Sequence, residues 1–392
     1  MKKIITLIAL FFTIFILTGC TQVVQLNDRL LVQGIGIDYE DEKYEVTLQV
    51  LNVESKGKEE NSSENPSKMK VLKSSGTTAM EAMRNIKEKS GKDPLFSQTL
   101  IIIIGSDAAK NGLAKFMDLF TRSYEFSPLI EVIIAEGKAF DILNLKDNKE
   151  IVSAENILSI SKMSSNENIS LESSIGNLIS DFKNEYSQAK ALYAQIENFN
   201  NEELNKKKSN KEKSNSEDSD EKESSKKELL INKIAIFKGD KMFDILDVDM
   251  TKGFLLIKSR AKGIKDVIFD EKIKTVTYSI IESKSKFKIS KKENLEVNLP
   301  IKVKIKLLET DNQLNSDDYE IIKKLIKIRL NNIVTATINK VIKDYELDIF
   351  GFSSNYLRKN FFSITKSSNE LKEKLRNADF KIDVSVNIES DK

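Results

Sequence analysis

The alternation of hydrophobic and polar positions predicts a β-hairpin near the start of the folded chain. Residues 29–53 read RLLVQGIGIDYEDEKYEVTLQVLNV, two runs rich in β-branched and aromatic residues around a polar turn at 39–43. Such runs joined by a short polar segment are typical of two antiparallel strands. Gly34 and Gly36 lack the third glycine and the following helix of a dinucleotide-binding loop, so that kind of site is not indicated.

Helical and strand periods alternate over the next part of the chain. Thr78 and Glu81 have the spacing of a capping box at the start of an amphipathic helix. Continuous apolar runs at 99–104 and 129–135 predict two buried strands, and a single amphipathic helix is expected between them. Strand, helix and strand in this order form a βαβ unit with parallel strands covered by helices. Further helices are expected at 139–145, 154–163 and 175–186, and a strand at 191–199.

The C-terminal half combines half-exposed strands with one long helix. Odd positions from 297 to 307 and even positions from 380 to 388 are apolar, which is the period of strands with one buried face. Pro300 favours an edge position for the first of them. Between them, residues 317–345 carry an apolar stripe at helical spacing, with Ser316 as the expected N-cap. This half is expected to be an α+β unit in which the long helix packs on an antiparallel sheet.

A charged segment at 201–228 divides the mature chain. Its only hydrophobic residue is one leucine, which is too little burial to offset chain entropy, so a disordered linker or long loop is expected. The fold class is therefore a multi-domain mixed α/β and α+β protein, in which helices cover mixed β-sheets. The expected units are a signal peptide at 1–19, an N-terminal mixed α/β domain at 20–200, the linker at 201–228, a small middle α/β domain at 229–283 and a C-terminal α+β domain at 284–392.

The first twenty residues, MKKIITLIALFFTIFILTGC, have the pattern of a lipoprotein signal peptide. Two lysines precede an apolar run at 4–17 that is shorter than the roughly 20 residues of a membrane-spanning helix. Small residues then lead to Cys20, the predicted site of lipid attachment. The mature protein is expected to be anchored on the outer face of the cytoplasmic membrane. The alternative is an uncleaved anchor or a plain secretory signal.

The composition excludes most catalytic chemistry. The chain has no histidine and one cysteine, so Ser-His-Asp triads, Cys-His pairs, intramolecular disulfides and zinc sites of His or Cys are ruled out. Ser-x-x-Lys pairs such as Ser159 and Lys162 are expected by chance in a lysine-rich chain, and the acidic clusters at 38–42 and 317–318 are interpreted as a hairpin turn and a helix start. With 62 basic and 60 acidic residues, nucleic-acid binding is not indicated. No enzymatic activity, cofactor or metal is predicted.

Several segments follow one another in a characteristic order and spacing: the lipobox at Cys20, GIGID at 34–38, SSGTTAMEAMRNI at 74–86, LFSQTLIIIIGSDAAKNGL at 95–113, Arg122 with Glu125, AEGKAFDIL at 135–143, KIAIFKGDKMFDIL at 233–246 and LDIFGF at 347–352. In this order and spacing they resemble the Ger(x)C family, the lipoprotein C subunits of spore germinant receptors. Family members commonly carry Trp-Asp after the lipid cysteine, a His before the isoleucine-rich strand and tryptophans near the C-terminus, whereas this chain has Thr21-Gln22, Gln98 and no tryptophan.

The resemblance implies three mixed α/β domains and no known enzymatic activity. It also implies assembly with two integral-membrane partners, the A and B subunits of the receptor, in the inner spore membrane. Nutrient-triggered germination would then require this subunit. The alternative from a different class is a free-standing cell-surface lipoprotein that binds a solute or a cell-wall polymer.

Overall fold

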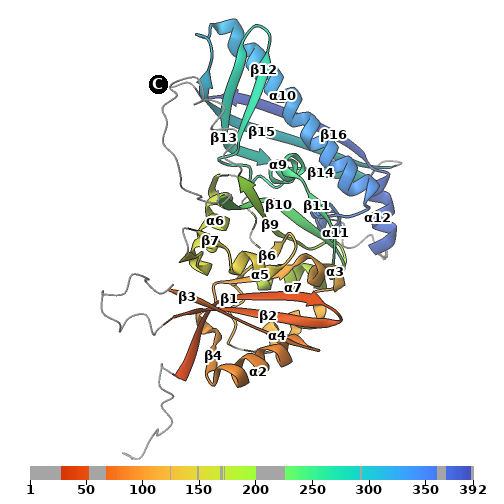
Figure 1. Ribbon diagram of the computed structural model, residues 1–392. Coiled ribbons are helices and arrows are strands. Elements are labelled where there is room, and N and C mark those ends of the chain that lie inside the picture. Colours follow the sequence, from red (N-terminus) through yellow and green to blue (C-terminus); the bar gives the residue numbers. More distant parts are fainter. Residues whose placement is uncertain are drawn as a thin grey trace, which may run out of the picture.

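The computed structural model describes residues 28–52, 68–123, 125–147, 150–167, 171, 173–199, 226–291, 294–359 and 368–389. These residues form a larger and a smaller mixed β-sheet, each with its own helices, stacked along the length of the molecule (Figure 1). The expected signal peptide, Cys20 and residues 201–225 of the expected linker lie outside the described residues.

The larger sheet has nine strands in the order β11-β10-β9-β6-β5-β1-β2-β3, with β4 beside β1. Its centre, from β1 through β5 and β6 to β9, is parallel, and antiparallel strands extend both ends. The predicted hairpin and the parallel β5–β6 pair are confirmed. The strands are β1 (Arg29–Glu40), β2 (Lys43–Leu51), β3 (Met69–Gly76), β4 (Asp93–Leu95), β5 (Ile101–Gly105), β6 (Glu131–Ala135), β9 (Lys190–Phe199), β10 (Lys226–Lys238) and β11 (Lys241–Leu246).

Helices cover both faces of this sheet. Ile102 and Ile104 pack into the hydrophobic cluster of one face, and Ile101 and Ile103 pack into the cluster of the other, which explains the continuous isoleucine run. The single helix expected after β5 is two helices, because Gly112 breaks it with a φ of +118°. One face carries α2 (Ala79–Ser90), the short η3 (Phe96–Gln98), α3 (Ser106–Asn111), α4 (Ala114–Arg122) and α7 (Ile175–Lys183), and the other carries α5 (Ala139–Leu143), the small β7 (Lys146–Asp147) and β8 (Glu150–Ile151) pair, and α6 (Ala154–Glu167).

The smaller sheet has the order β12-β13-β15-β14, with β16 on the other side of β15. The long helix α10 (Ser316–Ile338) covers one face and continues into the π-helical turn η4 (Asn339–Asp344), as the apolar stripe predicted. The other elements of this part are α9 (Val248–Ile257), β12 (Lys265–Asp270), β13 (Lys274–Ser285), β14 (Lys288–Lys291), β15 (Leu295–Thr310), α11 (Phe352–Lys359), α12 (Ser368–Arg376) and β16 (Asp379–Ile388).

Two expectations for this sheet were wrong. The sheet is mixed rather than antiparallel, because the chain crosses back through the helices and β16 then pairs with β15 in parallel. β15 is a central strand rather than an edge strand. Asn298 of β15 pairs with β14, and Ile301 pairs with β13. Pro300 lies between these two residues, where β13 replaces β14 as the neighbouring strand, and its missing amide is tolerated there.

Two predicted helix caps differ in detail. The N-cap of α10 is Asn315 rather than Ser316, and Asn315 forms a reciprocal capping box with Asp318. At α2 the Thr78 hydroxyl accepts a hydrogen bond from the Glu81 amide as expected, but the Glu81 carboxylate accepts from Thr77 instead of Thr78. Both helices still start within a residue of the predicted position, because the caps satisfy the same free backbone amides.

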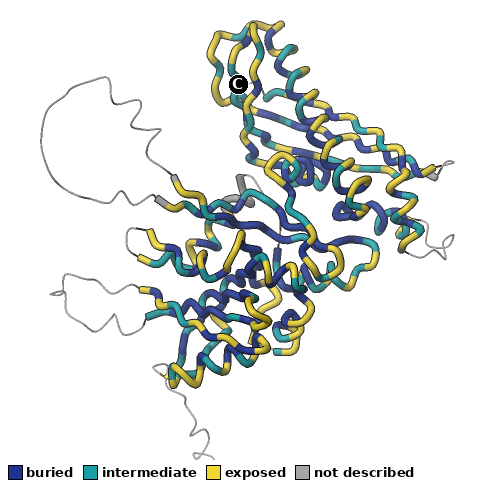
Figure 2. The backbone as a smooth tube through the Cα atoms, turned by 45° about the vertical axis from the view of Figure 1, so that its right-hand side comes forward, coloured by how far each residue is buried: buried dark blue, intermediate teal, exposed yellow. Residues whose placement is uncertain are grey.

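The structure does not show a separate middle domain at 229–283. β10 pairs with β9 along ten residues and already begins at Lys226, so the segment at 201–225 connects two strands of one sheet. The following elements β12 and β13 belong to the smaller sheet. The helix α9, which connects β11 to β12, packs against both sheets, and its buried residues belong to one hydrophobic cluster with residues of each sheet. Figure 2 shows buried residues on both sides of this junction between the sheets. The two halves therefore share a core.

Candidate functional site

Three of the segments that carry the family resemblance pack together around α5: GIGID at 34–38, the end of β5 at Gly105, and AEGKAFDIL at 135–143. Asp38 ends the GIGID segment, and its two carboxylate oxygens accept hydrogen bonds from the amides of Ala139 and Phe140 at 2.7 and 3.1 Å. Desolvation by burial raises the pKa of Asp38 and the two amide hydrogen bonds oppose that rise. Asp38 therefore caps a helix 101 residues away.

Glycine is required where α5 lies closest to the sheet. A Cβ atom at Gly34 or Gly36 would lie 2.9 Å from a methyl group of Leu143, and one at Gly105 would lie 2.1 Å from Oδ1 of Asp38. Gln49 closes the unit: its side-chain amide donates to the carbonyl of Leu143 at 2.8 Å and accepts from the amide of Ala154 at 2.6 Å. These residues act through packing and backbone hydrogen bonds, and sequence reasoning had assigned no role to Gln49.

The other candidate chemical groups do not assemble into an active site. Ser159 and Lys162 both lie on α6, and Asp318 caps α10 and forms an ion pair with Lys272 at 2.7 Å. Asp41 and Glu42 form the β1–β2 turn as predicted. Across the described ranges, no cluster of three or more His, Cys, Asp or Glu side chains is placed to hold a metal ion. Within the same ranges, no helix combines the length and apolar character needed to cross a membrane.

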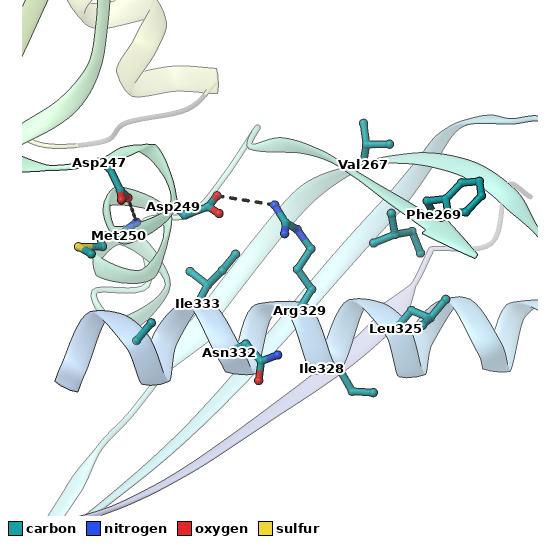
Figure 3. Close-up of a pocket in the computed structure, with 12 residues that line it drawn as sticks. Asp247, Asp249, Met250, Val267, Phe269, Leu325, Ile328, Arg329, Asn332 and Ile333 are labelled. Carbon is teal, nitrogen blue, oxygen red and sulfur yellow. Dashed lines mark hydrogen bonds and ion pairs between the residues drawn. The ribbon is translucent and has the colours of Figure 1, made fainter. Parts of the chain in front are cut away.

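The surface feature with the clearest binding potential is a groove between α9, β12 and α10, with a volume of about 560 Å³ (Figure 3). Apolar side chains around it are unusually exposed: Val267 by 49%, Phe269 by 68% and Ile328 by 48%. Exposed apolar residues gathered in this way mark interaction sites more often than scattered ones do. The lining residues are Asp247, Asp249, Met250, Val267, Ile268, Phe269, Leu325, Ile328, Arg329, Asn332, Ile333 and Ala336.

One end of the groove is charged and well ordered by ion pairs. Arg329 donates from Nε and Nη2 to the two carboxylate oxygens of Asp266 at 2.7 and 3.2 Å. Lys252 lies 3.4 Å from the same carboxylate, and Asp249 lies 3.6 Å from Arg329. Desolvation opposes the ionisation of Asp266, but the hydrogen bond from Arg329 and the charge of Lys252 outweigh it and lower the pKa of the carboxyl. The network ties α9 and α10 to the sheet.

We expect Asp266→Asn to lower the free energy of unfolding by about 2 kcal/mol at pH 7, because two cations lose a largely buried partner. Since the pKa of Asp266 is lower in the folded chain, its stabilisation is present above the unfolded value of about 3.9 and is lost as the pH falls through the folded value. The difference between the variant and the wild type should therefore shrink below about pH 4. Denaturant melts of the two proteins from pH 7 to pH 3 measure it.

The matched control for this prediction is Glu320→Gln, which removes an exposed carboxylate from the same helix α10. It is expected to change the free energy of unfolding by less than about 0.5 kcal/mol at any pH in that range. A difference for Asp266→Asn that stays constant down to pH 3 would contradict the assigned ion pairs.

Comparison with known proteins adds independent information. A family model described as "Spore germination protein N-terminal domain" matches residues 22–196, and one described as "Spore germination B3/ GerAC like, C-terminal" matches residues 232–391. The putative spore germination protein YfkR of Bacillus subtilis (strain 168) is 25% identical over 352 residues, which cover 88% of this chain and 85% of YfkR. Spore germination protein A3 of the same organism is 31% identical over 152 residues, 37% of this chain and 39% of that protein.

A solved structure shares the fold. The crystal structure of the GerBC protein aligns with a TM-score of 0.56 over 91% of this chain and 97% of GerBC, at 16% sequence identity. At this identity the match shows a common architecture of mixed sheets and helices, and it supports the predicted fold class.

Proposed function

This chain belongs to the GerAC family of spore germination proteins, and we propose on that basis that it is the lipid-anchored, non-enzymatic C subunit of a nutrient germinant receptor. A role in spore germination follows from the family itself. The observation that carries the finer proposal is the combination of two germination-family segments, in order over 22–196 and 232–391, with a lipobox at Cys20 directly before them.

The proposed partners are the membrane-embedded A and B subunits of the receptor, and the proposed location is the inner spore membrane. The chain would be held on the outer face of the cytoplasmic membrane by the lipid at Cys20. A role without catalysis is supported by the absence of histidine from the sequence and by the structural parts that Asp38 and Gln49 play. The groove beside β12 gives such a subunit a surface for protein contacts.

Gene deletion and affinity purification test this proposal together. Spores that lack the gene and its paralogues should lose germination in response to nutrients, while solute uptake by growing cells stays normal, and the wild-type gene should restore germination. Tagged protein from spore membranes should co-purify with two multi-span membrane proteins. Normal nutrient germination in the deletion strain would contradict the proposal and favour a free-standing binding lipoprotein.

A further inference from the structure

β12 is an edge strand whose three central residues, Val267, Ile268 and Phe269, are apolar. Within the described part of the chain it pairs with β13 and stands at the end of the strand order of the smaller sheet. Val267 and Phe269 point away from α10, on the face opposite to the buried Ile268 (Figure 3). An exposed edge with alternating apolar side chains is a template for pairing with another extended chain. Natural sheets usually protect such an edge with charges, a proline or a bulge.

The backbone groups of alternate β12 residues are directed to the open edge. Ile280 of β13 donates to the carbonyl of Ile264, so in this antiparallel pair the even residues that follow bond to β13 and the odd residues face outward. The amide of Val267 fits this alternation, since its acceptor is the Asp266 carboxylate at 3.0 Å rather than β13. The main-chain groups of Val267 and Phe269 are therefore placed to pair with a further strand.

The groove occupies the position that such a strand would take. A neighbouring strand lies about 4.8 Å from the edge of a sheet, and on this side of β12 the space is bounded by α10 and α9. Leu325 and Ile328 of α10 line the groove, so α10 extends past β12 and no strand among the described residues covers this part of the helix. An added strand would place its inward side chains on these two residues, just as β12 places Ile268 in the core.

We propose that β12 receives an extended segment of another subunit of the receptor complex, which pairs with its open edge and fills the groove. This proposal rests on the proposed function, and it specifies the surface through which the chain meets its partner. The segment would carry apolar side chains at alternate positions, which would contact Leu325 and Ile328 on one face of the sheet and Val267 and Phe269 on the other.

Charge determines what kind of segment the groove accepts. The lining contains two carboxylates, Asp247 and Asp249, and one cation, Arg329, so its charged end has a net negative charge. A segment with a lysine or arginine at that end would be complementary. A second copy of β12 is disfavoured, because each copy carries Asp266 and Asp270 against one lysine, Lys265, and the second copy would add its net negative charge to the acidic end of the groove.

The test uses the complete tagged protein in spores, with the photo-crosslinking residue p-benzoylphenylalanine at position 269. Irradiation is expected to give an adduct in which position 269 is joined to an extended segment of a co-purifying subunit, identified by mass spectrometry. The matched control carries the same residue at 319, since Tyr319 is an exposed aromatic residue of α10 outside the groove lining. Position 319 should not give that adduct.

Val267→Pro then tests the mode of binding. It removes an outward amide without breaking a β12–β13 hydrogen bond, and it should lower the yield of the adduct at least about fivefold, the change expected for the loss of a main-chain hydrogen bond. The control Val248→Pro places proline at the first position of α9, where it is tolerated, and should leave the yield within about twofold. Ile328→Glu, which leaves β12 unchanged, should lower the yield as much as Val267→Pro.

The outcomes are separable. An adduct between two copies of this chain, an adduct that Val267→Pro and Ile328→Glu leave unchanged, or no adduct while the subunits still co-purify would each overturn the edge-pairing proposal and leave the proposed function intact. Failure of the wild-type protein to co-purify with any membrane subunit, with normal germination after gene deletion, would overturn both.

Discussion

Replacing Cys20 by alanine is expected to abolish fatty-acid attachment and to remove the protein from the membrane fraction of spores. The cysteine is the sole thiol of the chain, so no other residue can take the diacylglycerol group. Each buried CH₂ of an acyl chain contributes about 0.8 kcal/mol to membrane binding, and two chains give stable anchoring. Labelling with an alkynyl fatty acid, followed by fractionation and detection of the tagged protein, measures both effects. Nutrient germination through the proposed receptor should decrease as well.

Thr21→Ala is the matched control, because it changes the adjacent residue and keeps the thiol. It should retain the label and the membrane location of the wild type. Mass spectrometry of the wild-type protein should find residues 1–19 removed. A wild-type protein that keeps Met1 and an unmodified Cys20, or a Cys20→Ala variant that still carries the fatty-acid label, would rule out the proposed anchor.

The sequence predicts the elements of this fold well where the signal is local. The stripe from Ile322 to Val341 is buried in the structure, and the β1–β2 hairpin turns at Asp41 and Glu42 as expected. The buried strand β5 follows from its isoleucine run. In each case the burial of one residue depends on neighbours a few positions away, so the hydrophobic period contains the information.

Sheet membership could not be obtained in this way. Leu229–Leu246 has the same strand pattern whether it begins a new domain or completes an earlier sheet, and the pairing of β10 with β9 across a polar segment decides between them. The parallel pairing of β15 with β16 likewise depends on the path of the chain through α10 to α12. Contacts between residues far apart in sequence leave no periodic trace, so the pairing of β10 with β9 could not be predicted from the hydrophobic pattern.

The groove was equally hidden in the sequence. Val267 and Phe269 belong to a run of three apolar residues, and nothing in their spacing shows that this strand stands at an edge. Arg329 lies at the border of the predicted stripe of α10, seven residues after Ile322, and its pairing with Asp266 spans 63 residues. A charged residue on an amphipathic helix usually points to solvent, so the ion pair that orders this site could only be found in the structure.

Asp348→Ala is expected to lower the free energy of unfolding by about 3 kcal/mol or more, a larger effect than that of Asp266→Asn. Asp348 is buried, and its Oδ1 accepts hydrogen bonds from the amides of Phe350, Gly351 and Phe352 at 3.1, 2.8 and 3.2 Å. Its Oδ2 accepts from the amide of Ser353 at 2.6 Å. Alanine would leave these four donors without their acceptor at the start of α11.

The loop around Asp348 also contributes two aromatic side chains to the hydrophobic core. Gly351 turns the chain with a φ of +79°, and the turn places Phe350 and Phe352 in the cluster shared by the two sheets. The ring of Phe350 lies 5.9 Å from that of Phe254 in α9, and the ring of Phe352 lies 4.7 Å from that of Phe287. Loss of the Asp348 carboxylate should therefore loosen the packing of α9 against the smaller sheet as well as the loop itself. The acid, the glycine and the two phenylalanines of the LDIFGF segment thus act together in one turn.

Thermal and denaturant unfolding of the purified protein measure the effect of Asp348→Ala, and hydrogen exchange locates it. The matched control is Asp344→Ala, four residues earlier, where the carboxylate is exposed and forms only a 3.8 Å ion pair with Lys340. That variant should change the free energy of unfolding by less than about 0.5 kcal/mol. Increased exchange in Asp348→Ala should appear at the start of α11 and in α9, because both depend on the positions of Phe350 and Phe352. Equal stability of the two variants would mean that the four amides have other acceptors. It would also mean that Asp348 does not stabilise the packing of α9 against the smaller sheet.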